Sequence, residues 1–353
     1  MTVLFAILLF SLLIFVHELG HFMAAKLSGV QVNEFSMFMG PAIVKWQRGE
    51  TQYSIRCIPF GGYCAMEGED KDTDNPRSFQ KAVWWKRLII LLAGAAMNFL
   101  AGLLIYSILL LPAKQVVIPE INQFMDCCTF DGADGLQLGD EILEIDGEKI
   151  YVNGDISTFL TLNPTDVHDI VVRRGDDVLE FRDFPMGHMH LDENGETYLH
   201  YGFAFGRARD ASVSDKLKNV WNVARDDVRM VRLSLQMLIR GDAGLKDMTG
   251  PLGIVQIMSD TAEASENTTD ALRSMLSIGA FIAINLAVMN LLPIPALDGG
   301  RAVGLLLTTG VEAVLGKKID PKYEGYIHGV GMVLLLALMA VILFKDIFTI
   351  FKG

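Results

Sequence analysis

The chain has 353 residues, of which 51% are hydrophobic and only 20% are charged. This composition excludes a disordered protein and argues against a purely soluble one. The formal net charge of −12 argues against nucleic acid as a partner, because nucleic-acid-binding domains are usually basic. The four cysteines, of which Cys127 and Cys128 are adjacent, have no CxxC spacing and do not predict a disulfide-rich domain.

Four apolar stretches are long enough to cross a bilayer, at residues 1–25, 88–111, 275–292 and 326–344. A span needs about 20 residues, since a helix rises about 1.5 Å per residue and the hydrocarbon layer is about 30 Å thick. The first stretch lacks the basic start and the small-residue cleavage site of a signal peptide, so we expect a retained helix. The sequence therefore predicts a polytopic α-helical membrane protein with four transmembrane helices.

The connecting segments differ in charge, which predicts the side of the membrane on which each lies. Residues 26–87 hold nine Lys and Arg, and residues 301–325 hold four. Residues 113–274, in contrast, hold 29 Asp and Glu against 15 Lys and Arg. The positive-inside rule places the two basic loops in the cytoplasm. The acidic segment and both termini are then expected outside it.

The first span contains three ionisable residues, His17, Glu18 and His21, in the sequence H-E-L-G-H. Residues four apart share a helix face, so both imidazoles can reach one ion. In zinc peptidases this HExxH pattern holds the metal through the two histidines, and the glutamate takes a proton from water. The alternative is a pair of helix-surface histidines with an incidental glutamate. An uncompensated ionisable residue in a span costs about 2.5–3.5 kcal/mol, which favours the metal site.

Two features follow between the first span and the acidic segment. Alternating residues and the punctuating Pro59, Gly61 and Gly62 predict a β-hairpin over residues 53–66. In the second span, Asn98 lies four residues from a glycine on either side. We interpret this stripe as a packing surface for a neighbouring helix.

The acidic segment contains a predicted β-rich domain at residues 113–206. A strand followed by Asp146-Gly147 predicts one hairpin, and residues 171–181 predict another. Apolar residues at helical spacing over 212–240 predict a long amphipathic helix. This helix could lie on the outer membrane surface or pack on the β-rich domain.

A third candidate metal ligand, Asp298, follows the third apolar stretch. Pro293 and Pro295 block helix continuation, and Gly299 and Gly300 permit a tight backbone. Non-helical backbone at membrane depth survives only where protein or a water-filled cavity surrounds it. We therefore expect this segment to break the span and present the carboxylate inward, completing a His₂Asp site. The alternative is an ordinary turn at the end of a span.

These motifs together resemble the site-2 protease family of intramembrane zinc metalloproteases, peptidase family M50. H-E-L-G-H at residues 17–21 is similar to the first motif of the family, and N-L-L-P-I-P-A-L-D-G-G-R at 290–301 to its second. The G-L-x-x-G-D-x-I-x-x-I-D-G pattern beginning at residue 135 resembles a PDZ domain, present in a single copy. The resemblance extends over nearly the whole chain and is closest to the bacterial members that act in regulated intramembrane proteolysis.

The resemblance implies a set of site residues. The zinc ligands would be His17, His21 and Asp298, the general base Glu18, and the substrate-binding residues Asn290, Gly61 and Gly62. An amide within a membrane is as often a link between helices as a catalytic group, so the role of Asn290 stays open. The hairpin is expected to associate with the membrane. Its strand edge could hold a substrate extended by β-augmentation.

The resemblance also implies a function and a location. We expect an intramembrane zinc endopeptidase in the bacterial inner membrane, with the PDZ domain extracytoplasmic and loops 27–86 and 302–325 cytoplasmic. Its partners would be the lipid bilayer and single-pass membrane-protein substrates, such as anti-sigma factors after a first extracytoplasmic cut or remnant signal peptides. The PDZ domain could bind a ligand, restrict access to the site or act as a spacer.

Along the chain we expect spans or domains at 1–26, 27–86 (loop with hairpin), 87–111, 113–206 (PDZ), 207–274 (amphipathic helical linker), 275–301, 302–325 (loop) and 326–350.

Two other functions would use some of the same residues. A non-hydrolytic PDZ adaptor with a structural metal is disfavoured because all four chemical residues are intact. An ion transporter is disfavoured because the chain lacks paired inverted repeats.

Overall fold

The structure is a computed structural model that describes residues 2–69, 73–125, 135–191, 197–244, 248–316 and 322–352. The chain divides into two compact units. Unit 1 comprises Met1–Tyr106 and Asp227–Gly353, and unit 2 comprises Ser107–Asp226. Cys127 and Cys128 lie outside the described residues.

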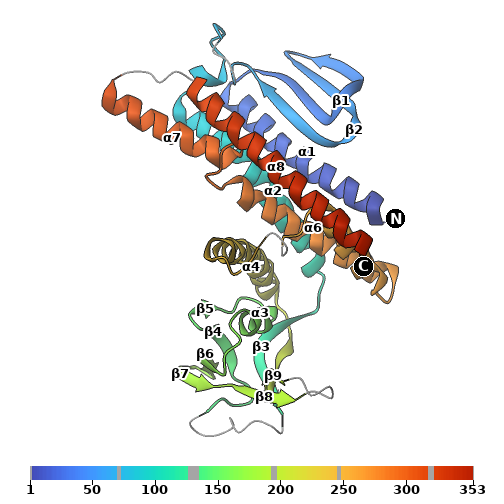
Figure 1. Ribbon diagram of the computed structural model, residues 1–353, viewed down its shortest axis with the longest axis vertical. Helices are drawn as coiled ribbons and strands as arrows, with labels where there is room; N and C mark the ends of the chain where they lie inside the picture. The colour runs from blue at the N-terminus through green and yellow to red at the C-terminus, as the bar shows by residue number, and fades with distance from the viewer. Residues whose placement is uncertain are drawn as a thin grey trace. The chain divides into compact units, whose positions relative to one another are not determined.

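Four helices are long and apolar enough to cross a membrane (Figure 1). They are α1 (Thr2–Ser28), α2 (Trp84–Leu110), α6 (Thr268–Asn290) and α8 (Lys322–Lys352), the last with its apolar part at Gly325–Thr349. The four predicted spans are thus confirmed as helices. The third begins earlier than its apolar stretch, because the Asn267 side chain accepts a hydrogen bond from the Asp270 amide and caps the helix there.

The amphipathic helix predicted over residues 212–240 is confirmed as α4 (Val213–Arg240). Two further helices are α5 (Pro251–Glu263) and α7 (Asp298–Leu315). The segment after residue 301, predicted as a connecting loop between two spans, is helical as far as Leu315, and α7 ends at Gly316 with φ +65°. Its Ala302 and Leu305 are buried in a hydrophobic core of unit 1, and this burial stabilises the helix.

The predicted pairing within residues 53–66 is also wrong. The hairpin consists of β1 (Val32–Arg48) and β2 (Thr51–Met66), and it turns at Gly49, where φ is +62°. Both strands bend, so that residues 34–37 pair with 52–55 on one side and with 62–65 on the other. Residues 34–37 of β1 therefore lie between the two segments of β2 that were predicted to pair with each other. The glycine-rich stretch marks a bend in β2, with φ +82° at Gly61, rather than a reversal.

Arg56 fastens the bent segments of the hairpin to one another. Its guanidinium donates to Glu34 Oε1 at 2.8 Å, to Tyr63 Oη at 2.5 Å and to the Gly40 carbonyl at 2.7 Å. Burial raises the pKa of Glu34, but hydrogen bonds from Ser54 and Arg56 outweigh it and hold the pKa at about 2. The ion pair between Arg56 and Glu34 is therefore charged at neutral pH. With the bond to Tyr63 it holds residues 62–65, the second arm of β2, in place.

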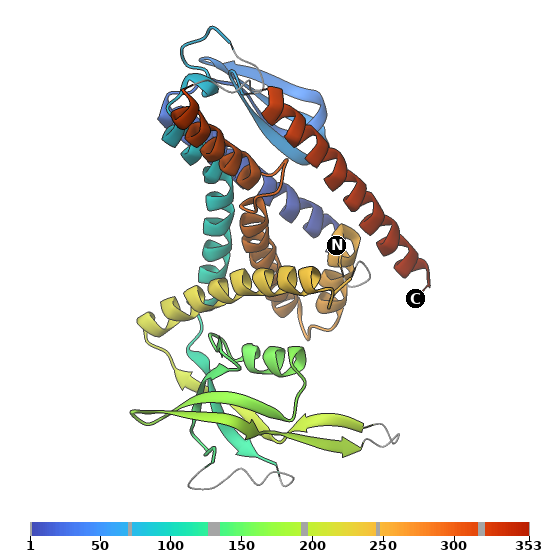
Figure 2. The same cartoon turned by 60° about the vertical axis from the view of Figure 1, so that its left-hand side comes forward.

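A hydrophobic core joins the hairpin to the helices of unit 1. Its buried members come from α1, β1, β2, the short 3₁₀ helix η1 (Phe79–Lys81), α2 and α7, and include Ala25, Phe35, Cys64, Ile90 and Leu305. Figures 1 and 2 show the hairpin at the end of unit 1 where α1 ends and α2 begins. This core fixes the second arm of β2 against α1, next to the motif residues.

The described residues of unit 2 form a β-rich domain that includes the short helix α3. Its main sheet has the order β10-β3-β4-β6-β7, with β5 paired to β4, and β8 and β9 form a separate hairpin. The elements are β3 (Gln115–Phe124), β4 (Glu141–Ile145), β5 (Glu148–Lys149), α3 (Gly154–Leu162), β6 (Val167–Arg174), β7 (Asp177–Pro185), β8 (Gly187–Leu191), β9 (Thr197–Tyr201) and β10 (Phe203–Asp210). Both predicted hairpins are confirmed, since β4 pairs with β5 and β6 with β7. At the first turn, Asp146 and Gly147 both have positive φ, as a two-residue hairpin turn requires.

Candidate metal centre

Two imidazoles meet on one face of α1. His17 and His21 lie one helical turn apart, with ring centroids 4.8 Å apart and Nε2 atoms 3.1 Å apart. His21 is buried and His17 is half-buried. The spacing of four residues produces this arrangement in a regular helix, as the sequence predicts.

The third side chain arrives from the break between α6 and α7. The helix α6 ends at Asn290, and an irregular segment that contains both prolines leads to Asp298, the first residue of α7. Asp298 Oδ2 lies 3.1 Å from His17 Nε2 and 3.2 Å from His21 Nε2. The structure therefore brings together three side chains that lie up to 281 positions apart in the sequence.

The dimensions of this triangle fit a zinc ion. Bonds of about 2.0–2.2 Å to tetrahedral Zn²⁺ put neighbouring ligand atoms about 3.3–3.6 Å apart. The three observed edges, 3.1, 3.1 and 3.2 Å, are slightly shorter than that range, so a small outward movement of the side chains would admit the ion. Asp298 Oδ2 is buried and has no hydrogen-bond partner among the described residues. A cation held by the three side chains would satisfy it, since a buried carboxylate oxygen without a hydrogen bond is costly.

Glu18 lies beside the second arm of β2. Its side chain is half-buried, and a methyl group built at Gly62 would lie 3.5 Å from its Cγ. In the part of the chain that the structure describes, residues 62–65 pair with β1 on one side only. The other edge of this segment, which includes Gly62, therefore lies beside Glu18. Gly61, at the bend, packs against Met39 and not against the ligand triangle.

Asn290 is not part of the ligand triangle. It is the last residue of α6 and is half-buried. Its substrate contact remains a prediction.

Two further residues, His328 and Arg301, hold the Asp298 segment. His328, in α8, accepts at Nδ1 a hydrogen bond of 2.9 Å from the Ala296 amide. Ala296 has φ +77°, a conformation unfavourable for a residue other than glycine. Arg301 donates to Glu69 Oε1 at 2.5 Å and so joins α7 to the loop after β2. No local sequence pattern signals either contact, because both partners are distant in the chain.

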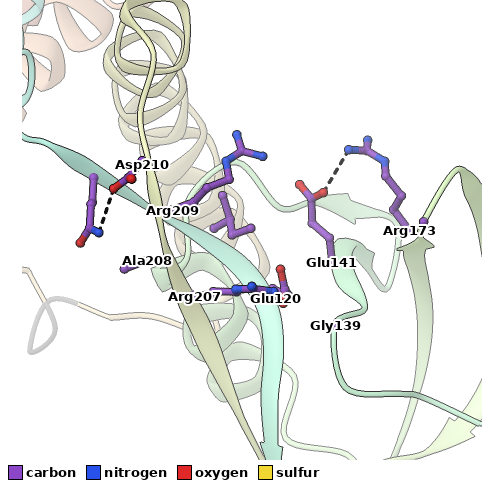
Figure 3. Close-up of a pocket in the computed structure, with 11 residues that line it drawn as sticks. Glu120, Gly139, Glu141, Arg173, Arg207, Ala208, Arg209 and Asp210 are labelled. Carbon is purple, nitrogen blue, oxygen red and sulfur yellow. Dashed lines mark hydrogen bonds and ion pairs between the residues drawn. The ribbon is translucent and has the colours of Figure 1, made fainter.

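Unit 2 carries a charged hollow of about 570 Å³. Arg173, Arg207 and Arg209 line it, and Figure 3 shows them together with several carboxylates. Each arginine pairs with an acid: Arg173 with Glu141, Arg207 with Glu120 and Arg209 with Asp215. Because the charges are already compensated, this hollow does not compete with the triangle in unit 1 as a catalytic site.

Comparisons with known proteins agree with this chemistry. The model of the family described as "Peptidase family M50" matches residues 5–338. The chain is 35% identical over 350 residues to "Putative zinc metalloprotease CPE1693" of Clostridium perfringens, covering 98% of each chain. It is 31% identical over 346 residues to "Putative zinc metalloprotease CA_C1796" of Clostridium acetobutylicum, covering 98% of this chain and 97% of the relative. It is 26% identical to "Regulator of sigma-W protease RasP" of Bacillus subtilis over 434 aligned positions, covering 99% of each.

Proposed function

The chain belongs to peptidase family M50, and from this premise we propose that it hydrolyses peptide bonds within the membrane, at the site formed by His17, His21, Asp298 and Glu18. It is a zinc metalloprotease and a multi-pass membrane protein. The observation that carries the proposal is the position of the triangle. Its two histidines belong to α1, a helix that is apolar and long enough to span a bilayer.

The proposed mechanism assigns one role to each side chain. His17, His21 and Asp298 would hold the ion, and when bound the zinc supplies Lewis-acid activation of water and of the scissile carbonyl. The Glu18 carboxylate would accept the proton of the attacking water and then deliver it to the leaving amine nitrogen. A substrate strand added at residues 62–65 would run beside Glu18 with its peptide bonds exposed, which a helical substrate does not allow.

Replacing Glu18 by glutamine tests this assignment. We expect the variant to keep its zinc, because the three ligands are unchanged, and to lose cleavage of a membrane-spanning reporter by at least about 100-fold. Bound zinc and cleavage are measured on the same purified protein. Glu67→Gln, the same chemical change after β2 and outside the candidate spans, serves as the control and should cleave normally. Unchanged cleavage by Glu18→Gln would exclude the proposed mechanism.

The alternative of a non-hydrolytic adaptor would require a closed structural site. Structural zinc sites are almost always tetrahedral with four protein ligands, whereas catalytic sites keep one position open. Within the described ranges the cluster has three members, which supports a catalytic site. The same Glu18→Gln experiment separates the two functions, since an adaptor has no cleavage to lose.

We further propose that unit 2 is a single PDZ domain on the extracytoplasmic side, with the hairpin and the α7 region on the cytoplasmic side. The charge distribution supports this orientation, because residues 113–274 hold 29 acidic and 15 basic residues. The substrates would be single-pass membrane proteins of the anti-sigma-factor type, already cut outside the membrane, or remnant signal peptides.

Deleting residues 115–205 tests whether the domain restricts access. If it does, the shortened protein should cleave full-length substrate that the intact protein cleaves only after trimming. Cleavage products are compared by gel electrophoresis for both substrate forms. The same deletion combined with Glu18→Gln should show no cleavage. A deletion protein that still requires trimmed substrate would refute the gate.

A further inference from the structure

One face of α2 lies against the two metal-binding histidines. Ile90, Gly94 and Asn98 are spaced by four residues and therefore share this face. All three are buried, and Asn98 is only 1% exposed. A methyl group built at Gly94 would lie 2.7 Å from His17 Cε1 and would also contact His21 Nε2. The stripe predicted as a packing surface thus borders the metal centre.

His21 has a hydrogen-bond partner on this face. Its Nδ1 lies 2.8 Å from the Ile90 carbonyl oxygen, so Nδ1–H donates, and in the neutral ring Nε2 is then free to bind a metal. In a helix the carbonyl of residue 90 is flanked by the side chain of residue 94. Because residue 94 is glycine, the imidazole can approach that carbonyl.

His17 requires the same arrangement to hold a metal through Nε2, since its proton must then lie on Nδ1 and needs an acceptor. The group facing Nδ1 is the Asn98 amide, whose Nδ2 lies 3.4 Å away. Two nitrogens cannot both donate here. The amide oxygen of Asn98, meanwhile, is buried with no hydrogen-bond partner in the described ranges.

Both problems have one solution. A half-turn of the amide about its Cβ–Cγ axis exchanges Oδ1 and Nδ2, which differ little in shape. Oδ1 then accepts the Nδ1–H of His17, and the amide NH2 takes the buried position that Oδ1 held. We propose that Asn98 is a positioning residue of the metal centre, which fixes the His17 tautomer that presents Nε2 to zinc. This inference rests on the proposed zinc site at His17, His21 and Asp298.

Zinc affinity tests the proposal without using cleavage. Full-length protein in detergent is titrated with zinc against a competing chelator, and the visible spectrum of its cobalt form is recorded. Asn98→Leu keeps the size of the side chain but removes the acceptor, so we expect affinity to fall about 10–100-fold and the cobalt bands to shift. Asn98→Asp keeps an acceptor for Nδ1–H and should bind zinc nearly as tightly as the wild type.

Ser11→Ala is the matched control. Ser11 is buried in α1 and donates to the Pro59 carbonyl at 3.0 Å, so its loss removes a buried hydrogen bond away from the triangle and should leave zinc affinity unchanged. Wild-type affinity in Asn98→Leu, with lowered thermal stability, would show that Asn98 only packs the helices and would overturn the inference alone. Zinc binding that survives His17→Ala would overturn the proposed site as well.

Discussion

The Asp298→Ala protein should bind no zinc under conditions that load the wild type, and it should not cleave a membrane-spanning substrate. Asp298 Oδ2 is one corner of the ligand triangle and lies 3.1 Å from His17 Nε2 and 3.2 Å from His21 Nε2. Its removal leaves two protein ligands, which do not make a catalytic zinc site. The loss of affinity should exceed the roughly 10–100-fold that loss of an outer hydrogen-bond partner costs. The zinc content of each protein after dialysis against a weak chelator measures this loss of affinity.

Unfolding is a competing explanation that the same variant can exclude. In the structure the buried Oδ2 of Asp298 lies 3.1 and 3.2 Å from the two imidazole nitrogens without a hydrogen bond among the described residues, and without metal this costs stability. The alanine variant should therefore melt no lower than wild-type protein from which zinc has been stripped. Asp270→Ala, an exposed change in the first turn of α6, is the control and should keep zinc. Zinc bound normally by Asp298→Ala would remove this residue from the ligand set.

The residues of the candidate site could be singled out in the sequence where local chemistry conflicts with a membrane span. His17, Glu18 and His21 are conspicuous because they are ionisable residues in an apolar helix. Asp298 is conspicuous because prolines and glycines surround it. In each case a few neighbouring residues carry the signal, and helix geometry alone converts the spacing into a shared face.

The remainder depends on tertiary packing that no local pattern encodes. The two arms of β2 do not pair with each other because residues 34–37 lie between them, and only strand bends at positive φ allow that arrangement. The orientation of α2 about its axis decides whether Asn98 faces only a neighbouring helix or the His17 imidazole. The spacing of Asn98 from Gly94 and Gly102 is the same in both cases, so the sequence does not distinguish them. The role of His328 likewise depends on a partner, Ala296, that is 32 residues away.

Gly94→Ala should abolish zinc binding although residue 94 is not a ligand. The added methyl group would lie 2.7 and 2.8 Å from two ring atoms of His17 and in contact with His21 Nε2. These distances are well below ordinary van der Waals separation, and both imidazoles are confined between α1 and α2. At least one ring must therefore turn away, and the triangle opens. Zinc binding measured by chelator competition should fall below detection, with cleavage lost in parallel.

Gly102→Ala, two turns along the same helix, separates this effect from simple disruption of packing. Its methyl group would meet Ile284 Cγ1 at 2.6 Å and the Ala280 carbonyl oxygen at 3.1 Å, far from any metal ligand. Both substitutions gain the same helix propensity, about 1 kcal/mol, so this contribution cancels in the comparison. Gly102→Ala should lower the melting temperature and keep zinc. Equal loss of zinc in both variants would mean that the spacing of α2 from its neighbours, and not direct contact with the histidines, controls the site.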